Sequence, residues 1–263
     1  MQKMGIEQLG FSTYGLTILG GRPAMGKTSF MLSIALNMAM HGNPVAIFSL
    51  ELSEKQLFIR LLSNICNLPL GEIRYKDGLS DSEIAQISDA MEKLQGLPLF
   101  IDDTLRLSVT ELRAKAELLV REHGVKMIAI DYLQLMSDGE NSTPRDSDIS
   151  KITHSLKELS KELDISVIAS LLLCHKPEDT TCEVRRPALS DIRKIGFIEK
   201  DAETICLIHR PEYYVSHQPD NDGDDIRGKA ELIYAKCPNG TGVVDMLFHK
   251  EYLRFEILNK KKQ

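Results

Sequence analysis

The sequence contains no tryptophan and few aromatic residues, and it lacks the long apolar segments of a membrane protein. Aromatic side chains make up 6% of the 263 residues, while 43% of the residues are hydrophobic and 27% are charged, which is typical of a globular domain. No apolar run approaches the roughly 18 residues that cross a bilayer, and the residues after Met1 form no apolar signal segment. We therefore expect neither membrane contact nor export.

Cysteine is also scarce, and its five residues form no CxxC pair. An odd number of scattered cysteines is typical of reduced thiols, so we expect a cytoplasmic protein without a disulfide framework. Cys174, His175 and Cys182 are residue types that ligate zinc, but their spacing fits no standard zinc site and a fourth ligand is missing. We therefore do not expect zinc. The remaining cysteines are Cys66, Cys206 and Cys237.

An excess of positive charge is missing as well. The formal net charge is −6, whereas a protein that grips DNA over its whole surface is usually basic. Any nucleic-acid site must therefore be a local stripe. The lysines at 260–262 are interpreted as a solvated tail and not as a binding patch.

The sequence does contain a regular alternation of strand-like and helix-like segments. Short apolar runs predict buried strands, and segments with apolar residues at three- and four-residue spacing predict helices between them. After about residue 228 the pattern changes to strands alone, with a hairpin turn at 236–240. We therefore predict an α/β fold with a mainly parallel sheet flanked by helices and a C-terminal antiparallel hairpin extension, in a single domain spanning 1–263. The predicted strands are 16–19, 45–50, 99–101, 127–130, 166–169, 204–208, 230–235, 243–248 and 254–257.

Capping signals support three of the predicted helices. Ser53, Ser80 and Ser108 are each followed three residues later by Gln or Glu, which is the pattern of a capping box. Two polar stretches, 138–148 and 217–225, are interpreted as loops. The expected apolar helix faces are Leu57, Leu61 and Ile65; Ile84, Ile87, Met91 and Leu94; and Ile149, Ile152, Leu156, Leu159 and Leu163.

One motif indicates the chemistry. Residues 21–28 satisfy the pattern GxxxxGK[ST], between a predicted strand and an apolar helix. In such a loop, glycines allow backbone N–H groups to turn toward phosphate oxygens, and the start of the helix adds a positive dipole. Lys27 is predicted to contact the β- and γ-phosphates, and the Thr28 hydroxyl to ligate Mg²⁺. We predict an ATP–Mg²⁺ site with the nucleotide-binding residues Gly21, Arg22, Pro23, Ala24, Met25, Gly26, Lys27, Thr28 and Ser29.

Two acids at strand ends extend this prediction. Asp131 follows four apolar strand residues, which favours the magnesium-holding carboxylate of a P-loop protein over an acid that only begins a turn. Glu51 suits either a base that polarises the attacking water or an acid that complements the dipole of the next helix, and the spacing leaves both interpretations open. Asp102 and Asp103 are interpreted as a turn and a helix start, not as a second metal site.

Beyond the P-loop string GGRPAMGKT at 20–28, five segments follow in order: FSLE at 48–51, IDYLQLM at 130–136, ITHSLKEL at 152–159, SDIR at 190–193 and IEKDA at 198–202. Together they resemble the motifs of DnaB-type replicative helicases, from about residue 12 to the end of the chain. The resemblance covers the C-terminal RecA-like motor, a P-loop NTPase. It implies a homo-hexameric ring with ATP bound between subunits and single-stranded DNA threaded through the centre, and a catalytic role for Glu51. We expect the family's N-terminal collar domain to be missing here, and therefore do not expect primase contact.

The resemblance also implies a DNA contact. Arg193, Lys194 and Gly196 fall on the family's channel-lining segment, which reads Arg-Glu-Ser-Gly in the family and Arg-Lys-Ile-Gly here. A lysine in place of the glutamate adds positive charge, which suits phosphate binding. Without the resemblance, a surface ion pair is the preferred interpretation of Arg193.

The sequence departs from the family pattern at two positions. Leu172 stands where the family has a glutamine, and leucine can neither donate nor accept a hydrogen bond. Pro238 replaces the arginine finger of the hairpin, which leaves Lys236 as the expected catalytic cation for a neighbouring subunit. Because an arginine finger contributes roughly 10³–10⁵-fold in rate, about 4–7 kcal/mol of transition-state stabilisation, we expect slow hydrolysis.

The function predicted from these motifs is an ATP-dependent DNA helicase motor of replication that translocates on single-stranded DNA. The two departures motivate an alternative, a catalytically weakened, nucleotide-gated DNA-binding or assembly protein derived from such a motor. A strand-exchange or clock-type ATPase with the same core is a third interpretation, which the string DYLQLM at 131–136 disfavours.

Overall fold

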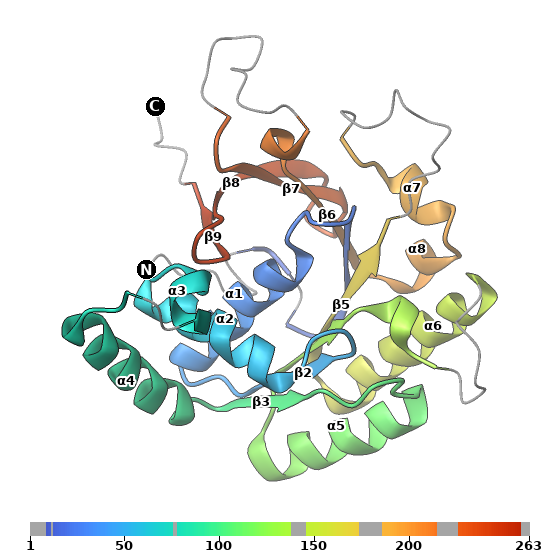
Figure 1. Cartoon of the computed structure of the whole chain (residues 1–263). Helices are drawn as coiled ribbons and strands as arrows, with labels where there is room; N and C mark the ends of the chain where they lie inside the picture. The colour runs from blue at the N-terminus through green and yellow to red at the C-terminus, as the bar shows by residue number, and fades with distance from the viewer. Residues whose placement is uncertain are drawn as a thin grey trace.

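In the computed structural model, nine strands of the described residues form one mixed sheet (Figure 1). The structure describes residues 9–11, 13–75, 78–137, 146–173, 186–214 and 226–258. The strands are β1 (Gly15–Gly21), β2 (Val45–Ser49), β3 (Leu99–Asp102), β4 (Met127–Asp131), β5 (Ser166–Leu172), β6 (Thr204–His209), β7 (Lys229–Lys236), β8 (Gly242–His249) and β9 (Arg254–Ile257). Their order across the sheet is β3-β2-β4-β5-β1-β6-β7-β8-β9.

The predicted division into parallel and antiparallel parts is confirmed. Strands β1 to β6 pair in parallel, and β7, β8 and β9 continue the sheet in antiparallel pairing. All nine predicted strands are present, and their ends differ from the prediction by at most three residues. The parallel part brings the carboxyl ends of β1, β2, β4 and β5 to one edge, where ligands bind in open α/β sheets.

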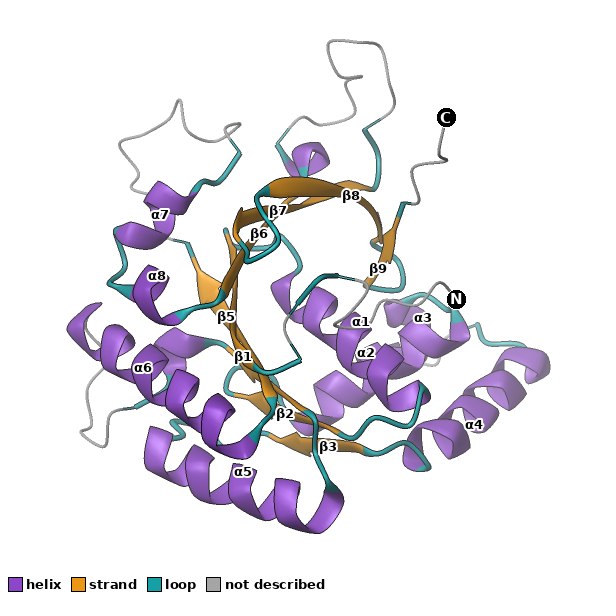
Figure 2. Cartoon of the chain, turned by 180° about the vertical axis from the view of Figure 1, so that it is seen from behind, coloured by secondary structure: helices purple, strands orange, loops and turns teal. Residues whose placement is uncertain are grey.

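Helices cover both faces of the sheet (Figure 2). Because successive strand residues point to opposite faces, β4 contributes Met127 and Ala129 to one core and Ile128 and Ile130 to the other. The first core also contains α1 (Lys27–Met40), α2 (Glu54–Cys66), α3 (Leu70–Tyr75) and α4 (Asp81–Gln95). The second contains α5 (Val109–His123), α6 (Asp146–Leu163), α7 (Leu189–Arg193) and α8 (Ile198–Asp201).

The antiparallel extension is part of the same structure as the parallel strands. Figures 1 and 2 show β7, β8 and β9 curving around α1. The backbone N–H of Phe255 on β9 donates to the Ser33 hydroxyl of α1 at 3.2 Å. The rings of Phe30 and Phe255 meet edge to face with their centroids 5.6 Å apart. The C-terminal hairpins therefore close over the helix that begins at the predicted phosphate loop.

The helix starts predicted from the sequence are confirmed, whereas the apolar face predicted for α4 is confirmed only in part. All three predicted capping boxes form at Ser53, Ser80 and Ser108, and the apolar face of α6 is buried at Ile149, Ile152, Leu156 and Leu159. The face predicted for α4 is wrong in part, since Ile84 is 54% and Met91 39% exposed while Ala90 and Leu94 are buried. The physical reason is position: α4 lies at the rim of the molecule against α2, so only part of its apolar stripe reaches the core.

Asp102 forms the predicted turn, whereas Asp103 bonds to the start of an earlier helix, α2, and the helix that follows is capped by Ser108. The Asp102 carboxylate accepts from the N–H of Thr104 at 3.0 Å, and Asp103 accepts from the N–H of Glu54, the first residue of α2, at 2.9 Å. The loop prediction at 138–148 extended three residues too far, because α6 begins at Asp146. The rest of that loop, the loop at 217–225, the tail lysines at 260–262 and the cluster at 174–182 lie outside the described residues. Within the described ranges, no helix has the length and apolar character needed to span a membrane.

Candidate functional site

The predicted phosphate loop connects the carboxyl end of β1 to the start of α1. β1 is buried along its whole length and pairs with β5 and β6, so the loop emerges from the centre of the sheet. The loop contains two residues with left-handed backbone, Ala24 at φ 61° and Gly26 at φ 91°. A Cβ at Gly26 would also lie 3.0 Å from the Phe255 ring. Both backbone conformation and space therefore require glycine at this position.

The start of α1 offers backbone donors. In the part of the chain that the structure describes, no side chain caps this helix, and its first turn contains no acidic residue. The first N–H groups of a helix have no partner within the helix, and the helix dipole makes this end positive. An uncapped start preceded by a glycine turn suits a bound phosphate.

Lys27 extends across this loop. Its ammonium donates to the carbonyl oxygens of Gly21 at 3.0 Å and Arg22 at 3.2 Å. Burial lowers the pKa of Lys27, while the carboxylates of Asp131 and Glu51 act in the opposite direction. The ammonium is therefore held at the phosphate loop, and Lys27 lines one cavity with the two acids Glu51 and Asp131.

Asp131 is the centre of a short hydrogen-bond network at the end of β4. The Thr28 hydroxyl donates to its Oδ2 at 2.6 Å, and the Ser170 hydroxyl of β5 donates to its Oδ1 at 2.5 Å. The carboxylate is buried, with Asp131 only 2% exposed. A carboxylate and a hydroxyl at this spacing are the hard oxygen donors that Mg²⁺ prefers, so the donor set fits the metal predicted for Thr28 and Asp131.

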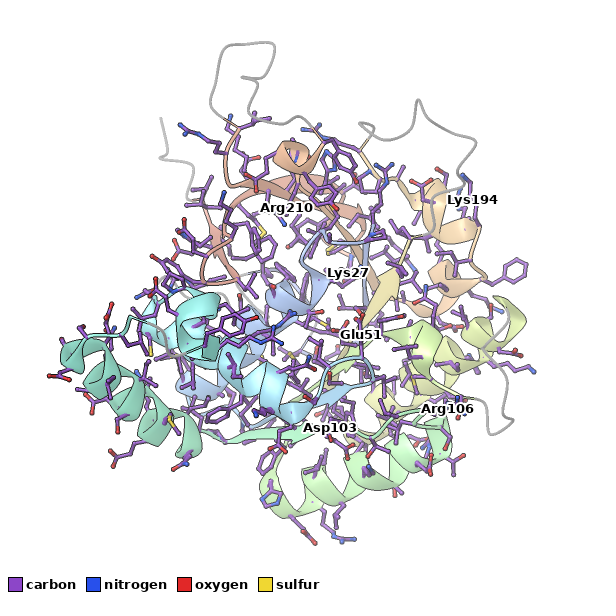
Figure 3. All side chains as sticks on the ribbon, viewed as in Figure 1. Lys27, Glu51, Asp103, Arg106, Lys194 and Arg210 are labelled. Carbon is purple, nitrogen blue, oxygen red and sulfur yellow. The ribbon has the colours of Figure 1, made fainter. Side chains whose placement is uncertain are left out.

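Glu51 lies just beyond β2 and lines the same cavity as Lys27 and Asp131. Among the described residues, the side chains that bond to the start of α2 are those of Ser53, Gln56 and Asp103. Glu51 is exposed and precedes the helix cap at Ser53 by two residues. This placement favours the interpretation of Glu51 as a residue of the cavity over that of a helix-dipole acid. Figure 3 shows Lys27 and Glu51 near each other at the centre of the molecule.

The cavity has a volume of about 570 Å³, within the usual range for small-molecule sites. Three residues of the predicted nucleotide-binding set, Gly21, Arg22 and Met25, do not line the cavity and instead contact other parts of the protein. The carbonyls of Gly21 and Arg22 accept from Lys27, the Arg22 guanidinium lies 5.6 Å from the Tyr214 ring centroid, and Met25 is 1% exposed. The predicted residues that line the cavity are Pro23, Ala24, Gly26, Lys27, Thr28 and Ser29.

Three basic residues of the cavity were missed by the sequence interpretation. Arg60 comes from α2, Arg210 follows β6 and Lys250 follows β8, so no local pattern connects them. Burial lowers the pKa of Arg60, and the nearby Asp131 and Glu51 oppose that effect.

Arg210 donates to the carbonyl of Ala24 at 3.2 Å and lies 4.0 Å from the Phe248 ring centroid, so it braces the phosphate loop. Of the described lining residues, four are cationic and two are acidic. A cavity with this balance suits a polyphosphate with its metal.

Leu172, where the family pattern has a glutamine, also lines the cavity. Its backbone is held by the side chain of Gln134, which accepts from the Leu172 N–H at 3.2 Å and donates to the Leu172 carbonyl at 2.8 Å. Gln134 belongs to the string DYLQLM. This amide fixes the end of β5 beside the cavity, a role for which the sequence offered no signal.

The structure does not bring the predicted DNA-binding residues or Lys236 to this cavity. Arg193 forms a two-point ion pair with Glu199, at 2.6 and 3.0 Å, and Lys194 lies 3.7 Å from Asp191. The Lys236 ammonium donates to the carbonyls of Glu199 at 2.7 Å and Ala202 at 2.6 Å. Figure 3 shows Lys194 beside α7, well away from Lys27.

Some of these residues line a second cavity. Its volume is about 500 Å³, and Arg193, Gly196 and Lys236 are among the residues that line it. The pairing of Arg193 with Glu199 agrees with the surface ion pair that the local sequence suggested. Lys236 is half-buried, and its ammonium is held by two carbonyls of its own chain.

A GxxxxGKT loop at the carboxyl end of a central parallel strand, with a buried aspartate on a nearby strand, defines the class: a P-loop protein with a RecA-like α/β fold. The family model described as DnaB-like helicase C terminal domain matches residues 2–257. The chain belongs to this DnaB-like helicase family and corresponds to its C-terminal domain.

Curated relatives agree. The chain is 38% identical over 255 residues to the replicative DNA helicase DnaB of Geobacillus stearothermophilus, covering 96% of this chain and 54% of the relative. It is 37% identical over 255 residues to the replicative DNA helicase DnaC of Bacillus subtilis (strain 168), covering 96% of this chain and 54% of that relative. The chain therefore spans about half the length of these relatives.

Solved structures show the same fold. A structure described as an ATPase domain superposes with a TM-score of 0.85 at 29% identity, covering 98% of this chain and 92% of that one. A DnaB-like replicative helicase, described together with its interactions with primase, superposes with a TM-score of 0.84 at 30% identity. The match covers 93% of this chain and 59% of that one. The predicted RecA-like fold is confirmed.

Proposed function

We propose that this chain is the ATP-driven motor of a replicative DNA helicase and that it translocates on single-stranded DNA. The observation that carries the proposal is the joint placement of Lys27, Glu51 and the Thr28–Asp131 pair around one cavity. The naming of the relatives as replicative DNA helicases supports the motor over the weakened, nucleotide-gated alternative.

The proposed roles follow from the geometry of the cavity. Lys27 and the first N–H groups of α1 bind the phosphates of ATP, and Arg60, Arg210 and Lys250 add positive charge around them. Thr28 and Asp131 hold Mg²⁺, which when bound neutralises phosphate charge. Glu51, exposed at the cavity wall, accepts the proton of the attacking water.

We further propose that residues 1–263 act as one domain and assemble as a homo-hexameric ring. ATP lies between subunits, and Lys236 provides a cation to the cavity of a neighbour. The position of Lys236 outside its own nucleotide cavity supports this. Single-stranded DNA contacts Arg193, Lys194 and Gly196, and the exposed side chains of Arg193 and Lys194 are compatible with phosphate binding. We place this activity in the cytoplasm.

The test is ATP turnover with and without single-stranded DNA, combined with unwinding of a forked duplex. Wild type should show DNA-stimulated turnover and unwinding. Glu51→Gln should keep ATP binding and lose about 10²–10⁴-fold in turnover, the range for a positioned general base. Lys27→Ala should lose ATP binding. The proposal fails if wild type shows neither DNA-stimulated turnover nor unwinding at any protein concentration.

A further inference from the structure

Phe197 is the most exposed large hydrophobic side chain in the described part of the chain, at 84%. It belongs to neither of the two core clusters that the described residues form. The fold therefore gains little from an aromatic ring here, since hydrophobic stabilisation follows the apolar area removed from water.

The backbone that presents this ring is fixed. The Phe197 N–H donates to the Ser150 hydroxyl of α6 at 3.0 Å, and the Phe197 carbonyl accepts from the N–H of Lys200 at 3.2 Å. The apolar residues on either side, Ile195 and Ile198, are buried at 8% and 0% exposure. Because its neighbours are anchored in the core, the Phe197 backbone is fixed, and its side chain extends into solvent.

The ring lines the second cavity together with basic side chains. Arg193, Lys200 and Lys236 line it as well, and the described lining contains one carboxylate, that of Glu199. This local balance of three cations and one acid contrasts with the net charge of −6 for the chain. A protein partner docked on the ring would have to desolvate three cations, although the described lining offers a single acid, which is already paired with Arg193, and that desolvation is costly.

An exposed aromatic ring among cations suits single-stranded nucleic acid. Cations such as Arg193 and Lys200 suit phosphates along the backbone, and the ring offers a face on which a base stacks, whatever the base. We propose that Phe197 stacks on a base of the single-stranded DNA whose phosphates Arg193 and Lys194 contact, an inference that rests on the proposed function. Phe197 is thus a DNA-contacting residue in addition to those of the channel segment.

The chain offers a direct probe of this contact, because it contains no tryptophan. Phe197→Trp introduces a single indole, and its fluorescence should be quenched by oligo-dT and not by an abasic oligonucleotide of the same length. Wild type should bind oligo-dT more tightly than the abasic strand, by about 5- to 150-fold for one stacked base. Phe197→Leu should bind both strands with the same affinity.

The control is Tyr75→Leu, which removes another exposed aromatic side chain, on α3. It should leave both affinities unchanged. The mass of the assembly is measured for every variant. The stacking contact is refuted if wild type binds both strands equally and Phe197→Leu changes nothing, a result that leaves the proposed function standing.

The stacking contact is also refuted if Phe197→Leu alters the assembly mass and lowers the affinity for both strands by the same factor, because Phe197 is then a contact between subunits. If wild type binds neither strand, DNA binding and stacking fail together.

Discussion

Ser170→Ala tests the network around Asp131 most directly. The substitution removes the 2.5 Å hydrogen bond to Oδ1 of a carboxylate that is 2% exposed. A hydrogen bond to a charged group contributes about 1.5–3 kcal/mol, and leaving a buried acceptor without its donor costs a comparable amount. For a chain of this size, 1 kcal/mol corresponds to about 2–4 °C in Tm. We therefore expect Tm to fall by roughly 3–12 °C.

The strand itself provides a matched control. Ser166 lies on β5 with Ser170 and is fully buried, but its hydroxyl forms no hydrogen bond with any described residue. Ser166→Ala therefore removes the same atoms from the same strand without breaking a bond, and its Tm should stay close to wild type. The assay is thermal unfolding of all three proteins without nucleotide. Equal Tm values for Ser166→Ala and Ser170→Ala would refute the reasoning.

The same variant carries a functional consequence. Ser170 orients the carboxylate predicted to hold Mg²⁺, and removal of such an outer partner typically weakens metal affinity about 10- to 100-fold. The Mg²⁺ concentration that gives half-maximal ATP turnover should rise by that factor in Ser170→Ala and remain unchanged in Ser166→Ala. An unchanged Mg²⁺ requirement would mean that Ser170 stabilises the fold without orienting the metal ligand.

Two further substitutions test the outer face of the subunit. Glu199→Gln removes the charged partner of Arg193 and should raise the affinity for single-stranded DNA several-fold, measured by fluorescence anisotropy at low salt. The control Arg193→Ala should lower that affinity. The Arg193 hydrogen bonds lower the pKa of Glu199, so this acid stays charged down to a lower pH than an ordinary glutamate. The difference in DNA affinity between wild type and Glu199→Gln should therefore persist from about pH 5 to 8. Equal affinities of the two proteins would contradict this prediction. Pro238→Arg restores a guanidinium on the exposed hairpin turn and should raise ATP turnover at least tenfold, below the roughly 10³–10⁵-fold ceiling of an arginine finger; unchanged turnover would show that Lys236 suffices.

The elements that the sequence predicted correctly are those whose signal is local. Buried parallel strands are continuous apolar runs, and each capping box lies within four consecutive residues, as at Ser53 and Ser108. The prediction of the apolar face of α4 was wrong in part because burial is not a local property. Periodicity shows that a stripe exists, but the area of the stripe that is covered depends on which elements pack against it, and α4 lies at the rim.

The sequence by itself predicted the phosphate loop at 21–28 and the strand-end acid Asp131, because each follows a predicted strand directly and has a characteristic neighbourhood. It left two interpretations of Glu51 open, and the family resemblance was needed to favour the catalytic one. Only the tertiary structure decided what completes the cavity. Ile130 of β4 pairs with Ala169 of β5, so the next residues, Asp131 and Ser170, lie side by side although 39 positions separate them.

The same holds for Arg60 of α2 and for Arg210 and Lys250, which follow β6 and β8, and for the bond from Lys236 to the carbonyl of Glu199. A hydrogen bond or an ion pair needs two groups within about 3 Å. Strand register and helix packing set that distance, and no pattern along the chain contains it.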